Sequence, residues 1–510
     1  MHRKATIFTA FSLIIAFAFT AITLLLYPLW GDVSTFLSTN FPVMLAASIW
    51  GGLSSAALLY WLETKTFGRR WQYILFSITD VAMIGLLGYL LYQLGTERSV
   101  LRRQFIVALP YALWFGAIIL YLWFMPRWKV LQSRKALVPF LIVLGVSALV
   151  WFNLPFQFEF TSRPVAFIQN GGVVVTWGTN MTATGQVNYS LDGSPAQTIS
   201  HQTFGLRDVG DRIVRVFLPI SSDPVSLSFT AASEGIRAIH PISMEKAGRL
   251  ESETVTVPFP SKGDDISFVS FSDIHERADV YNSLAAHIPW NEMDLAVYNG
   301  DLLNSTVNPE QVTHSILGLS TGGLDLPRLF VRDNHETRNE GARLLDDWML
   351  PTGGTWYQAF TFGNTFFIVL DCGEDKLDDH QEYGGLVDFT SYQKEQAAWL
   401  DGVLKSPEFQ QAQYQIVITH MPLFGEEQEP PAFEPVASLL RNNQDIDLML
   451  NGHTHIYGIF SPEESGLPYP VAFSGGPEMD SAAAVVVNMT ANSPQVKIID
   501  TNGTIVEQLP

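Results

Sequence analysis

Residues 266–275, ISFVSFSDIH, decide the fold, because an apolar run ends there in a carboxylate and an imidazole. Four later segments repeat this arrangement, each placing polar side chains directly after an apolar, β-rich run: LAVYNGD (295–301), RLFVRDN (328–334), YQIVITH (414–420) and DLMLNGH (447–453). Short apolar runs of this kind predict buried strands. Since the carboxyl ends of parallel strands meet at one edge of a sheet, we expect these polar side chains to share a site.

The polar residues at these strand ends form five short motifs that suit metal binding. They are Asp273-Ile274-His275, Gly300-Asp301-Leu302-Leu303-Asn304, Asn334-His335-Glu336, Thr419-His420 and Gly452-His453-Thr454-His455. Five of the chain's 11 histidines fall in them. A set of carboxylate, imidazole and amide groups of this size suits a pair of divalent cations better than one structural zinc ion. We therefore predict a hydrolase that uses two metal ions.

The ordered set resembles the calcineurin-like metallophosphoesterase superfamily, whose pattern is D-x-H, G-D-x-x-[DN], G-N-H-[DE], a lone His and G-H-x-H. The resemblance covers roughly residues 264–500. A single motif such as Thr419-His420 is weak, because a lone histidine at a strand end is more often structural than a ligand. Five motifs in the right order are specific. The resemblance implies a two-sheet α/β sandwich with the metals at the strand ends.

This resemblance also implies a role for each candidate residue. Asp301 would bridge two divalent ions, expected to be Mn, Fe or Zn, because one carboxylate can neutralise both cations. The other ligands would be Asp273, His275 and His455 for the first ion, and Asn334, His420 and His453 for the second. A metal-bound hydroxide would attack phosphorus, and His335 would protonate the leaving oxygen or stabilise its charge.

Two positions leave alternatives open. Asp333 stands where the superfamily motif has glycine. Aspartate tolerates a left-handed backbone better than most residues, which would preserve the turn; alternatively, its charge would raise metal affinity or alter substrate choice. We favour the turn. Asn304 has either a turn role or a role in the site.

Residues 160–260 resemble the fibronectin-type β-sandwich that precedes the catalytic domain in purple acid phosphatases. The likeness rests on residues 164–190, and it extends to residues 357–371 and 393–404. Purple enzymes, however, carry a tyrosinate ligand at the position of Asn304 and a D-x-G motif where this chain has His275. Without that tyrosine there is no phenolate-to-iron charge transfer, so we expect a protein that is not purple.

The first 154 residues predict an all-α transmembrane bundle of about five helices. Apolar runs at 7–29, 41–62, 72–94, 104–125 and 136–154 are each long enough to cross a bilayer. A signal peptide is the alternative for the first run, but the run is long and no A-x-A-like cleavage site follows before Asp32. We expect anchoring to be the main role of this bundle.

The basic residues around these runs predict an orientation. Arg3, Lys4, Lys65, Arg69, Arg70, Arg127, Lys129, Arg134 and Lys135 would share one side, against Arg98, Arg102 and Arg103 on the other. The richer side is expected to be cytoplasmic. We therefore expect an integral protein of the cell membrane, with a cytoplasmic N-terminus and an extracytoplasmic catalytic domain.

The distribution of charged residues also separates the first 154 residues from the rest of the chain. The first 154 residues hold 12 of the 30 basic residues and four of the 50 acidic ones, which leaves 18 basic and 46 acidic residues for the rest. A surface that negative repels polyanions, so we expect no nucleic-acid partner.

These features together predict a membrane-anchored hydrolase of phosphoric esters, in first place a phosphomonoesterase of the acid-phosphatase type. The ligand set also allows a phosphodiesterase or a pyrophosphatase acting on nucleotide or lipid-linked substrates. A non-catalytic membrane receptor is the third alternative, but a degenerate scaffold would be expected to lose metal ligands first. The expected partners are a phosphorylated small-molecule or lipid-linked substrate and the lipid bilayer.

Overall fold

The computed structural model describes residues 158–220, 223–240, 243–425, 431–490 and 493–509. All of them belong to one compact unit, Pro155–Pro510. The five membrane spans predicted between residues 7 and 154 lie outside these described residues. Within the described ranges, no helix is both long and apolar enough to cross a bilayer.

The larger sheet has nine strands, and its centre is parallel. Its order is β23-β22-β21-β12-β13-β14-β1-β2-β8, and β12, β13 and β14 run parallel to one another. The strands are β12 (Ile266–Phe271), β13 (Leu295–Asn299), β14 (Arg328–Val331), β1 (Val165–Gln169), β2 (Gly172–Gly178), β8 (Ile213–Pro219), β21 (Ala483–Met489), β22 (Pro494–Asp500) and β23 (Ile505–Leu509). Three apolar runs singled out in the sequence are therefore neighbouring parallel strands.

A second sheet of six strands holds the other two runs. Its order is β15-β16-β17-β18-β20-β19, with β16, β17, β18 and β20 parallel. The strands are β15 (Gln358–Phe362), β16 (Thr365–Val369), β17 (Tyr414–Ile418), β18 (Leu448–Asn451), β19 (Gly458–Phe460) and β20 (Val471–Phe473). The two sheets face each other through an apolar layer, in which the rings of Phe268 and Phe367 meet edge to face at 5.4 Å.

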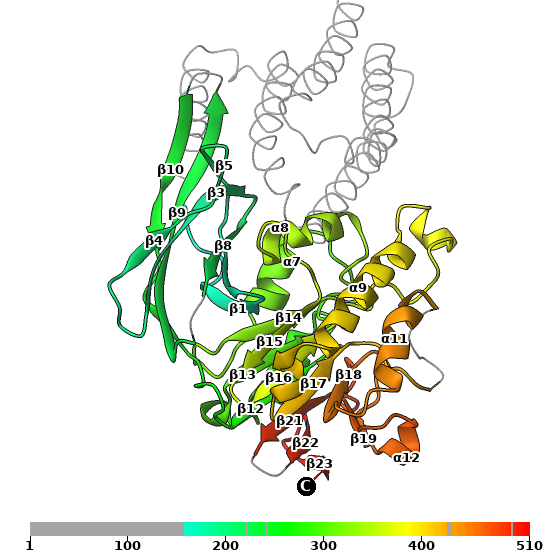
Figure 1. Ribbon diagram of the computed structural model, residues 1–510. Coiled ribbons are helices and arrows are strands. Elements are labelled where there is room, and N and C mark those ends of the chain that lie inside the picture. The colour runs from blue at the N-terminus through cyan, green and yellow to red at the C-terminus, as the bar shows by residue number, and fades with distance from the viewer. Residues whose placement is uncertain (1–157, 221–222, 241–242, 426–430, 491–492, 510) are drawn as a thin grey trace, which may run out of the picture. The chain divides into compact units, whose positions relative to one another are not determined.

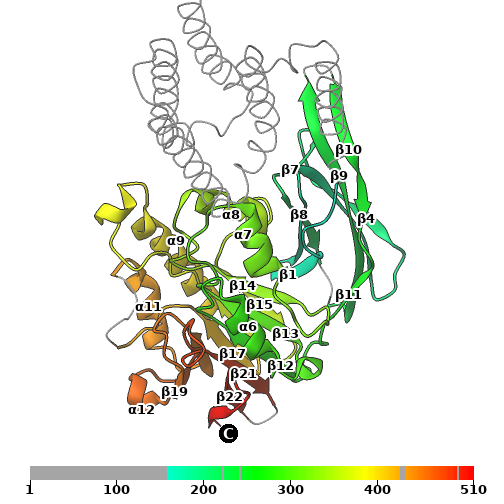
Figure 2. The ribbon, with the colours of Figure 1, turned by 180° about the vertical axis from the view of Figure 1, so that it is seen from behind.

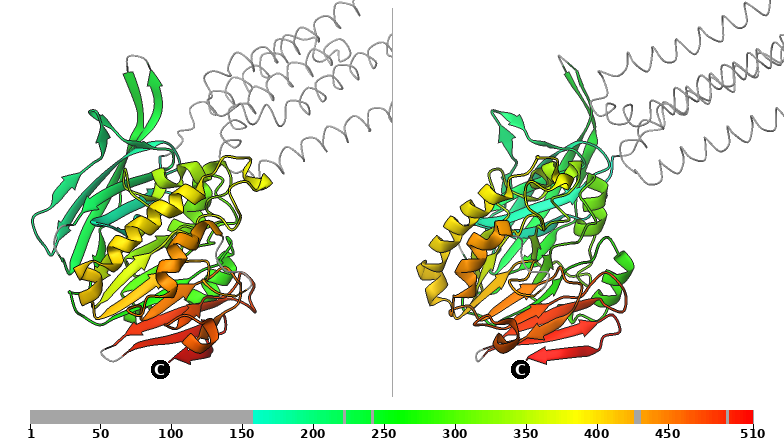
Figure 3. Two further views of the ribbon diagram at one scale, coloured as in Figure 1. Left: turned by 45° about the vertical axis from the view of Figure 1, so that its right-hand side comes forward. Right: turned by 90° about the vertical axis from the view of Figure 1, so that its right-hand side faces the viewer.

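Helices cover the outer face of each sheet, as Figures 1 and 2 show from opposite sides. The larger sheet is covered by α6 (Ala278–Ala285), η2 (Trp290–Glu292), α7 (Pro309–Val312), η3 (Thr313–Leu317) and α8 (Leu345–Met349), and η4 (Glu340–Leu344) leads directly into α8. The second is covered by α9 (Phe389–Leu404), α10 (Pro407–Gln411), η6 (Pro431–Phe433) and α11 (Glu434–Arg441). Two short helices remain: η5 (Gln381–Tyr383) precedes α9, and α12 (Pro462–Ser465) follows β19. The right-hand view of Figure 3 shows the strands between the yellow and orange helices on one side and a green helix on the other.

Because both faces of the parallel strands are covered, their sequences are continuous apolar runs rather than alternating ones. Every residue of β13, β14, β16, β17 and β18 is buried. The predicted two-sheet α/β sandwich is confirmed.

Residues 160–260 form the β-rich region that the sequence predicts. A further sheet has the order β10-β9-β3-β4, with β11 paired to β9 and β7 paired to β3, and a separate two-stranded sheet pairs β5 with β6. The strands of these two sheets are β3 (Ala183–Leu191), β4 (Gln197–Ile199), β5 (Gln202–Thr203), β6 (Leu206–Arg207), β7 (Val209–Gly210), β9 (Ser226–His240), β10 (Ser243–Glu251) and β11 (Val255–Pro258).

Strands β1, β2 and β8 connect this region to the larger sheet, of which they are part. Strand β1 pairs in parallel with β14 through Phe167 and Arg328. The indole Nε1 of Trp177 in β2 donates to Ser233 Oγ in β9 at 2.8 Å, and the two layers share one apolar core. The nine-stranded sheet is therefore continuous across both regions of the sequence. The assignment of the region as a fibronectin-type sandwich stays a prediction.

Candidate metal centre

The predicted ligands come together at the carboxyl ends of five strands from both sheets. Strand β12 is followed by Asp273 and His275, β13 by Asp301, and β14 by Asp333 and Asn334; β17 is followed by His420, and β18 by His453 and His455. Two groups of side chains result, and Asp301 belongs to both. In each group the potential ligand atoms all lie within 4.8 Å of one another.

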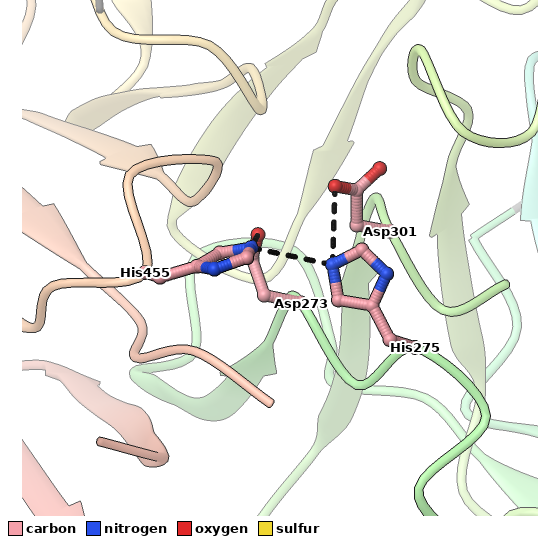
Figure 4. Close-up of side chains that lie close together, drawn as sticks. All are labelled: Asp273, His275, Asp301 and His455. Atoms are coloured by element: carbon pink, nitrogen blue, oxygen red, sulfur yellow. Dashed lines mark hydrogen bonds and ion pairs between the residues drawn. The ribbon is translucent and has the colours of Figure 1, made fainter. Parts of the chain in front are cut away.

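The first group consists of Asp273, His275, Asp301 and His455 (Figure 4). His275 Nε2 lies 3.3 Å from His455 Nε2 and 3.5 Å from Asp301 Oδ2. His455 Nε2 lies 3.5 Å from Asp273 Oδ1. The Asp273 side chain is fully buried, whereas that of His455 is 47% exposed, so this group is reached from the His455 side.

The second group consists of Asp301, Asp333, His420 and His453. His420 Nε2 lies 2.9 Å from Asp333 Oδ2 and 3.4 Å from Asp301 Oδ2. The other ring nitrogen of His420, Nδ1, donates to the carbonyl oxygen of Asn299 at 2.6 Å. This hydrogen bond fixes the ring and directs Nε2 toward the carboxylates, which is the usual support of a metal-binding histidine.

The spacing of these atoms fits divalent metal ions. Nitrogen and oxygen ligands about 2.1 Å from one tetrahedral ion lie about 3.4 Å from each other. The separations in the first group, 3.3 to 3.5 Å, match this value. Two acceptor nitrogens of neutral imidazoles also do not approach each other without a shared proton or cation. Among the described residues, the buried His420 Nε2 makes no hydrogen bond of good geometry, although carboxylate oxygens of Asp333 and Asp301 lie within 2.9 and 3.4 Å of it. The arrangement thus suits a centre for two divalent ions.

Burial sets the protonation of the groups in the absence of metal. It raises the pKa of Asp273 and that of Asp333 to about 7 each, although the nearby His420 opposes both shifts. Burial lowers the pKa of His275 to about 4 against the pull of Asp301. The pKa of His453 also falls to about 4, because burial and the charge of His420 act together. At neutral pH these two imidazoles are therefore neutral and ready to bind, whereas the two carboxylates still compete for protons.

Metal binding is therefore expected to depend on pH. A cation binds the deprotonated carboxylates, so below pH 7 it must displace the protons of Asp273 and Asp333. Each displaced proton weakens the apparent affinity by up to about tenfold per pH unit. Calorimetric titration of the metal-free protein with Mn²⁺ should show weaker binding and greater proton release at pH 6 than at pH 8. Equal affinities at the two pH values would contradict this expectation.

The backbone of the site is held in unusual conformations. Asp273, His275, Asp301, His453 and His455 have φ angles between 46° and 70°. A non-glycine residue in this left-handed region costs about 1–2 kcal/mol, and such residues concentrate at functional sites. A Cβ atom on Gly300 would lie 2.5 Å from His420 Nδ1, so only glycine allows this approach. The fold therefore sustains local strain to bring these ligands together.

His335 lies at the rim of the site, with 26% of its side chain exposed. Its Nδ1 donates to the carbonyl oxygen of Asn304 at 2.7 Å, and its Nε2 lies 3.8 Å from Asp301 Oδ2. Arg338 Nη1 lies 3.3 Å from the same Nε2, and arginine can only donate. In a ring that carries one proton, these contacts place the proton on Nδ1 and leave Nε2 as an acceptor. Asn304 acts here through its backbone, while its side-chain amide donates to His275 O at 3.2 Å.

Glu336 connects two of the loops that carry ligands, a role that the sequence does not indicate. Its buried carboxylate accepts from the backbone N–H groups of Asp301 and Leu303 at 3.1 Å, and from that of Asp333 at 3.3 Å. The third motif does contain this glutamate, but its partners are known only once the loops after β13 and β14 are adjacent. Arg338, which contacts His335, lies outside the motifs.

The turn interpretation of Asp333 is wrong. Asp333 is absent from the described non-glycine residues with positive φ, so the position makes no demand for a left-handed backbone. Its side chain is instead fully buried among the candidate ligands. Asn334 lies beside it, also buried, with its side-chain amide between Asp333 Oδ2 and Arg338 Nη2. The assignment of Asn334 as a metal ligand stays a prediction.

Residues 266–457 match the family model described as calcineurin-like phosphoesterase. No curated protein matches the chain. Similar solved structures include the purple acid phosphatase PPD1 from yellow lupin (Lupinus luteus) seeds, with 13% identity and a TM-score of 0.47 over 68% of this chain and 73% of that one. PhoD has 12% identity and a TM-score of 0.44 over 70% and 92% of the two chains. A dimetal phosphatase from Danio rerio has 14% identity and a TM-score of 0.38 over 48% and 98%.

Proposed function

We propose that this protein, a metal-dependent phosphoesterase by its calcineurin-like phosphoesterase domain at residues 266–457, hydrolyses phosphoric esters at a centre that holds two divalent ions. One observation carries the proposal: two groups of ligand atoms converge at five strand ends and share Asp301. A single structural ion would need one such group.

The ligand assignment follows from the two groups. Asp273, His275 and His455 would hold the first ion, His420 and His453 the second, and Asp301 both; the remaining position on the second ion belongs to Asp333 or Asn334. The ions, when bound, supply a water nucleophile at neutral pH and neutralise charge on the phosphoryl oxygens. We propose Mn, Fe or Zn as the metals, since imidazole and carboxylate ligands suit all three.

The residues of the chain then have separate tasks. The buried carboxylate of Asp301 lies between the two groups and keeps them at a fixed separation. His335 is aimed at the same place, because the hydrogen bond from Nδ1 to Asn304 O leaves Nε2 facing Asp301. To protonate a leaving oxygen, Nε2 must first gain a proton, and the contact with Arg338 must then open.

The substrate class is proposed as phosphomonoesters first and phosphodiesters or pyrophosphates second. The likeness of residues 160–260 to the fibronectin-type region of purple acid phosphatases supports the monoester, and a small-molecule or lipid-linked substrate is compatible with a membrane protein. The acidic balance of residues 155–510 argues against nucleic acid as a partner.

The test uses the full-length protein purified in mild detergent, with Mn²⁺ or Zn²⁺ added. Turnover of p-nitrophenyl phosphate above that of bis(p-nitrophenyl) phosphate would support the monoesterase, and the reverse order would support the diesterase. Turnover of neither ester by a protein that binds two ions would count against both.

We also propose that residues 7–154 anchor the enzyme in the cell membrane by about five helices. The apolar runs and the excess of basic residues on one side support this topology, with the phosphoesterase outside the cytoplasm. A reporter fused after Pro510 should therefore lie outside the cytoplasm, and only a reporter that works there should be active. A reporter that is active in the cytoplasm would overturn the orientation.

A further inference from the structure

Arg338 places a positive charge at the rim of the centre, beside the proposed proton donor. Its Nη1 lies 3.3 Å from His335 Nε2, and that nitrogen lies 3.8 Å from Oδ2 of Asp301, the carboxylate shared by the two ligand groups. The Arg338 side chain is 27% exposed, so a substrate at the centre can reach it. Residues 155–510 hold 18 basic and 46 acidic residues, so a phosphorylated substrate needs local positive charge where it binds.

Two carboxylates fix one side of the Arg338 guanidinium group and leave the other side toward the centre. Glu374 Oε2 accepts from Nε at 3.1 Å and from Nη2 at 3.0 Å, and Asp375 Oδ1 accepts from Nη2 at 2.9 Å. Glu374 is buried and also accepts from Tyr383 Oη at 3.1 Å. Nη1 carries two N–H groups, yet among the described residues its one hydrogen-bond partner is His335 Nε2, at a long 3.3 Å. The fold therefore holds a fixed arginine with a weakly used donor at the rim.

Arg277, two residues after His275, offers no such donor. Asp279 accepts from its Nε and from its Nη2 at 3.1 Å each, and Glu478 accepts from its Nη1 at 3.1 and 3.2 Å. All three nitrogens of Arg277 therefore face carboxylates. Of these two arginines beside the motifs, only Arg338 directs a nitrogen toward the centre.

The number of oxygens on phosphorus separates the two ester classes. A phosphomonoester has three non-bridging oxygens, and a phosphodiester has two. With one oxygen facing each ligand group, a monoester retains a third charged oxygen, whereas a diester has its second ester group there. Guanidinium groups form strong, charge-assisted hydrogen bonds with such oxygens. When His335 Nε2 is within about 2.6–3.2 Å of the leaving oxygen, Nη1 of Arg338 lies beside the other oxygens of the same phosphorus.

We propose that Arg338 binds the third phosphoryl oxygen of a monoester through Nη1 and thereby selects monoesters over diesters. This binding opens the contact between Nη1 and His335, so Nε2 becomes accessible to the leaving oxygen. Arg338 is then a specificity-determining residue that touches the substrate, and Glu374 and Asp375 position it. The inference rests on the proposed function and names its substrate class.

The experiment measures hydrolysis of p-nitrophenyl phosphate and of bis(p-nitrophenyl) phosphate by the Mn²⁺-loaded, full-length parent and by Arg338→Gln. The two esters share a leaving group, so a change at the leaving oxygen affects both alike. The variant is expected to lose about 10–100-fold in kcat/KM on the monoester, as for one lost hydrogen bond to a charged group, and far less on the diester. Most of the loss should appear as a raised KM, because the oxygen is bound before the reaction as well as during it.

Inorganic phosphate gives a readout that does not depend on turnover. Calorimetric titration of the Mn²⁺-loaded protein with phosphate should show an affinity about 10–100-fold weaker for Arg338→Gln than for the parent, with the same metal content in both. Because this change leaves the buried Glu374 without its cation, Arg338→Lys is the second variant. It retains the charge, but one ammonium group cannot bind the carboxylates and a phosphoryl oxygen as a guanidinium fork does. It should melt as a folded protein and show the same selective loss on the monoester.

A matched control is Lys376→Gln. Lys376 Nζ donates to Asp375 Oδ1 at 2.8 Å, so this change removes one positive charge from the same cluster but keeps the donor beside His335. The control should keep the parent's ratio of monoester to diester hydrolysis and its phosphate affinity.

Two results would overturn the inference. The first is an equal loss on the two esters, which would make Arg338 only a support of the loop that carries His335. The second is an unchanged phosphate affinity in folded Arg338→Gln and Arg338→Lys. Both differ from a failure of the proposed function, in which the parent itself would turn over neither ester, and the phosphate titration would test Arg338 in that case too.

Discussion

Replacing Asp301 by asparagine is expected to lower kcat by about 10²–10⁴-fold and to reduce the metal content of the protein. Asp301 is buried, belongs to both ligand groups and lies 3.4 to 3.5 Å from the nitrogens of His420 and His275. An amide of the same shape carries no charge, so both cations lose a shared counter-ion. Removing one partner of a buried charge pair costs about 3–5 kcal/mol, which corresponds to this range of rates.

The measurement is kcat with p-nitrophenyl phosphate together with metal content for the parent, Asp301→Asn and the control Asp294→Asn. The control removes an equally charged group from the opposite end of β13 and should keep the parent's activity and metal. An Asp301→Asn enzyme as active as the parent would rule out a mechanism that shares this carboxylate between two ions.

Replacing His335 by glutamine is expected to slow the reaction in a way that depends on the leaving group. General acid catalysis is worth about 10²–10⁴-fold when the leaving oxygen is basic. An alkyl phosphate should therefore lose activity in this range, whereas p-nitrophenyl phosphate, whose leaving group is stable as an anion, should lose far less. The metal content should stay at two ions, because His335 belongs to neither ligand group.

The leaving-group series also separates this role from a structural one. If His335 served only to hold the loop of Asn304, to which its Nδ1 donates at 2.7 Å, both substrates would slow by the same factor. Equal losses on the two esters would therefore contradict a role as proton donor.

The strands and the site loops are the parts of this molecule that sequence predicts well. The runs before Asp301, Asp333 and His420 are mainly apolar because both faces of these strands are covered. Where such a strand ends, the chain enters a loop at the edge of the sheet, and the polar residue that comes next lies in the site. Even His420, the weakest motif alone, lies where the order of motifs predicts.

Features that depend on residues far apart in the chain cannot be predicted from local sequence patterns. The pairing of Phe167 in β1 with Arg328 in β14 joins two sequence regions into one sheet, and no local pattern encodes such a pairing. The turn prediction for Asp333 is wrong for the same reason. A local sequence pattern indicates only the backbone preference of Asp333, whereas the structure brings its carboxylate to His420, 87 residues later in the chain.

Side chains that support the ligands are the least predictable from sequence. Glu336 is part of a motif, but its role appears only when the loops of Asp301 and Asp333 lie around it. Arg338 has no sequence signal, because an arginine in a polar loop is ordinarily a solvated surface residue. Its contact with Glu374 is a product of the tertiary fold.

The most direct test of the two-ion centre is anomalous diffraction from crystals of the protein soaked in Mn²⁺. We expect two peaks about 3.5–4 Å apart, one on each side of Asp301. A single peak, or two peaks that do not share the Asp301 carboxylate, would contradict it.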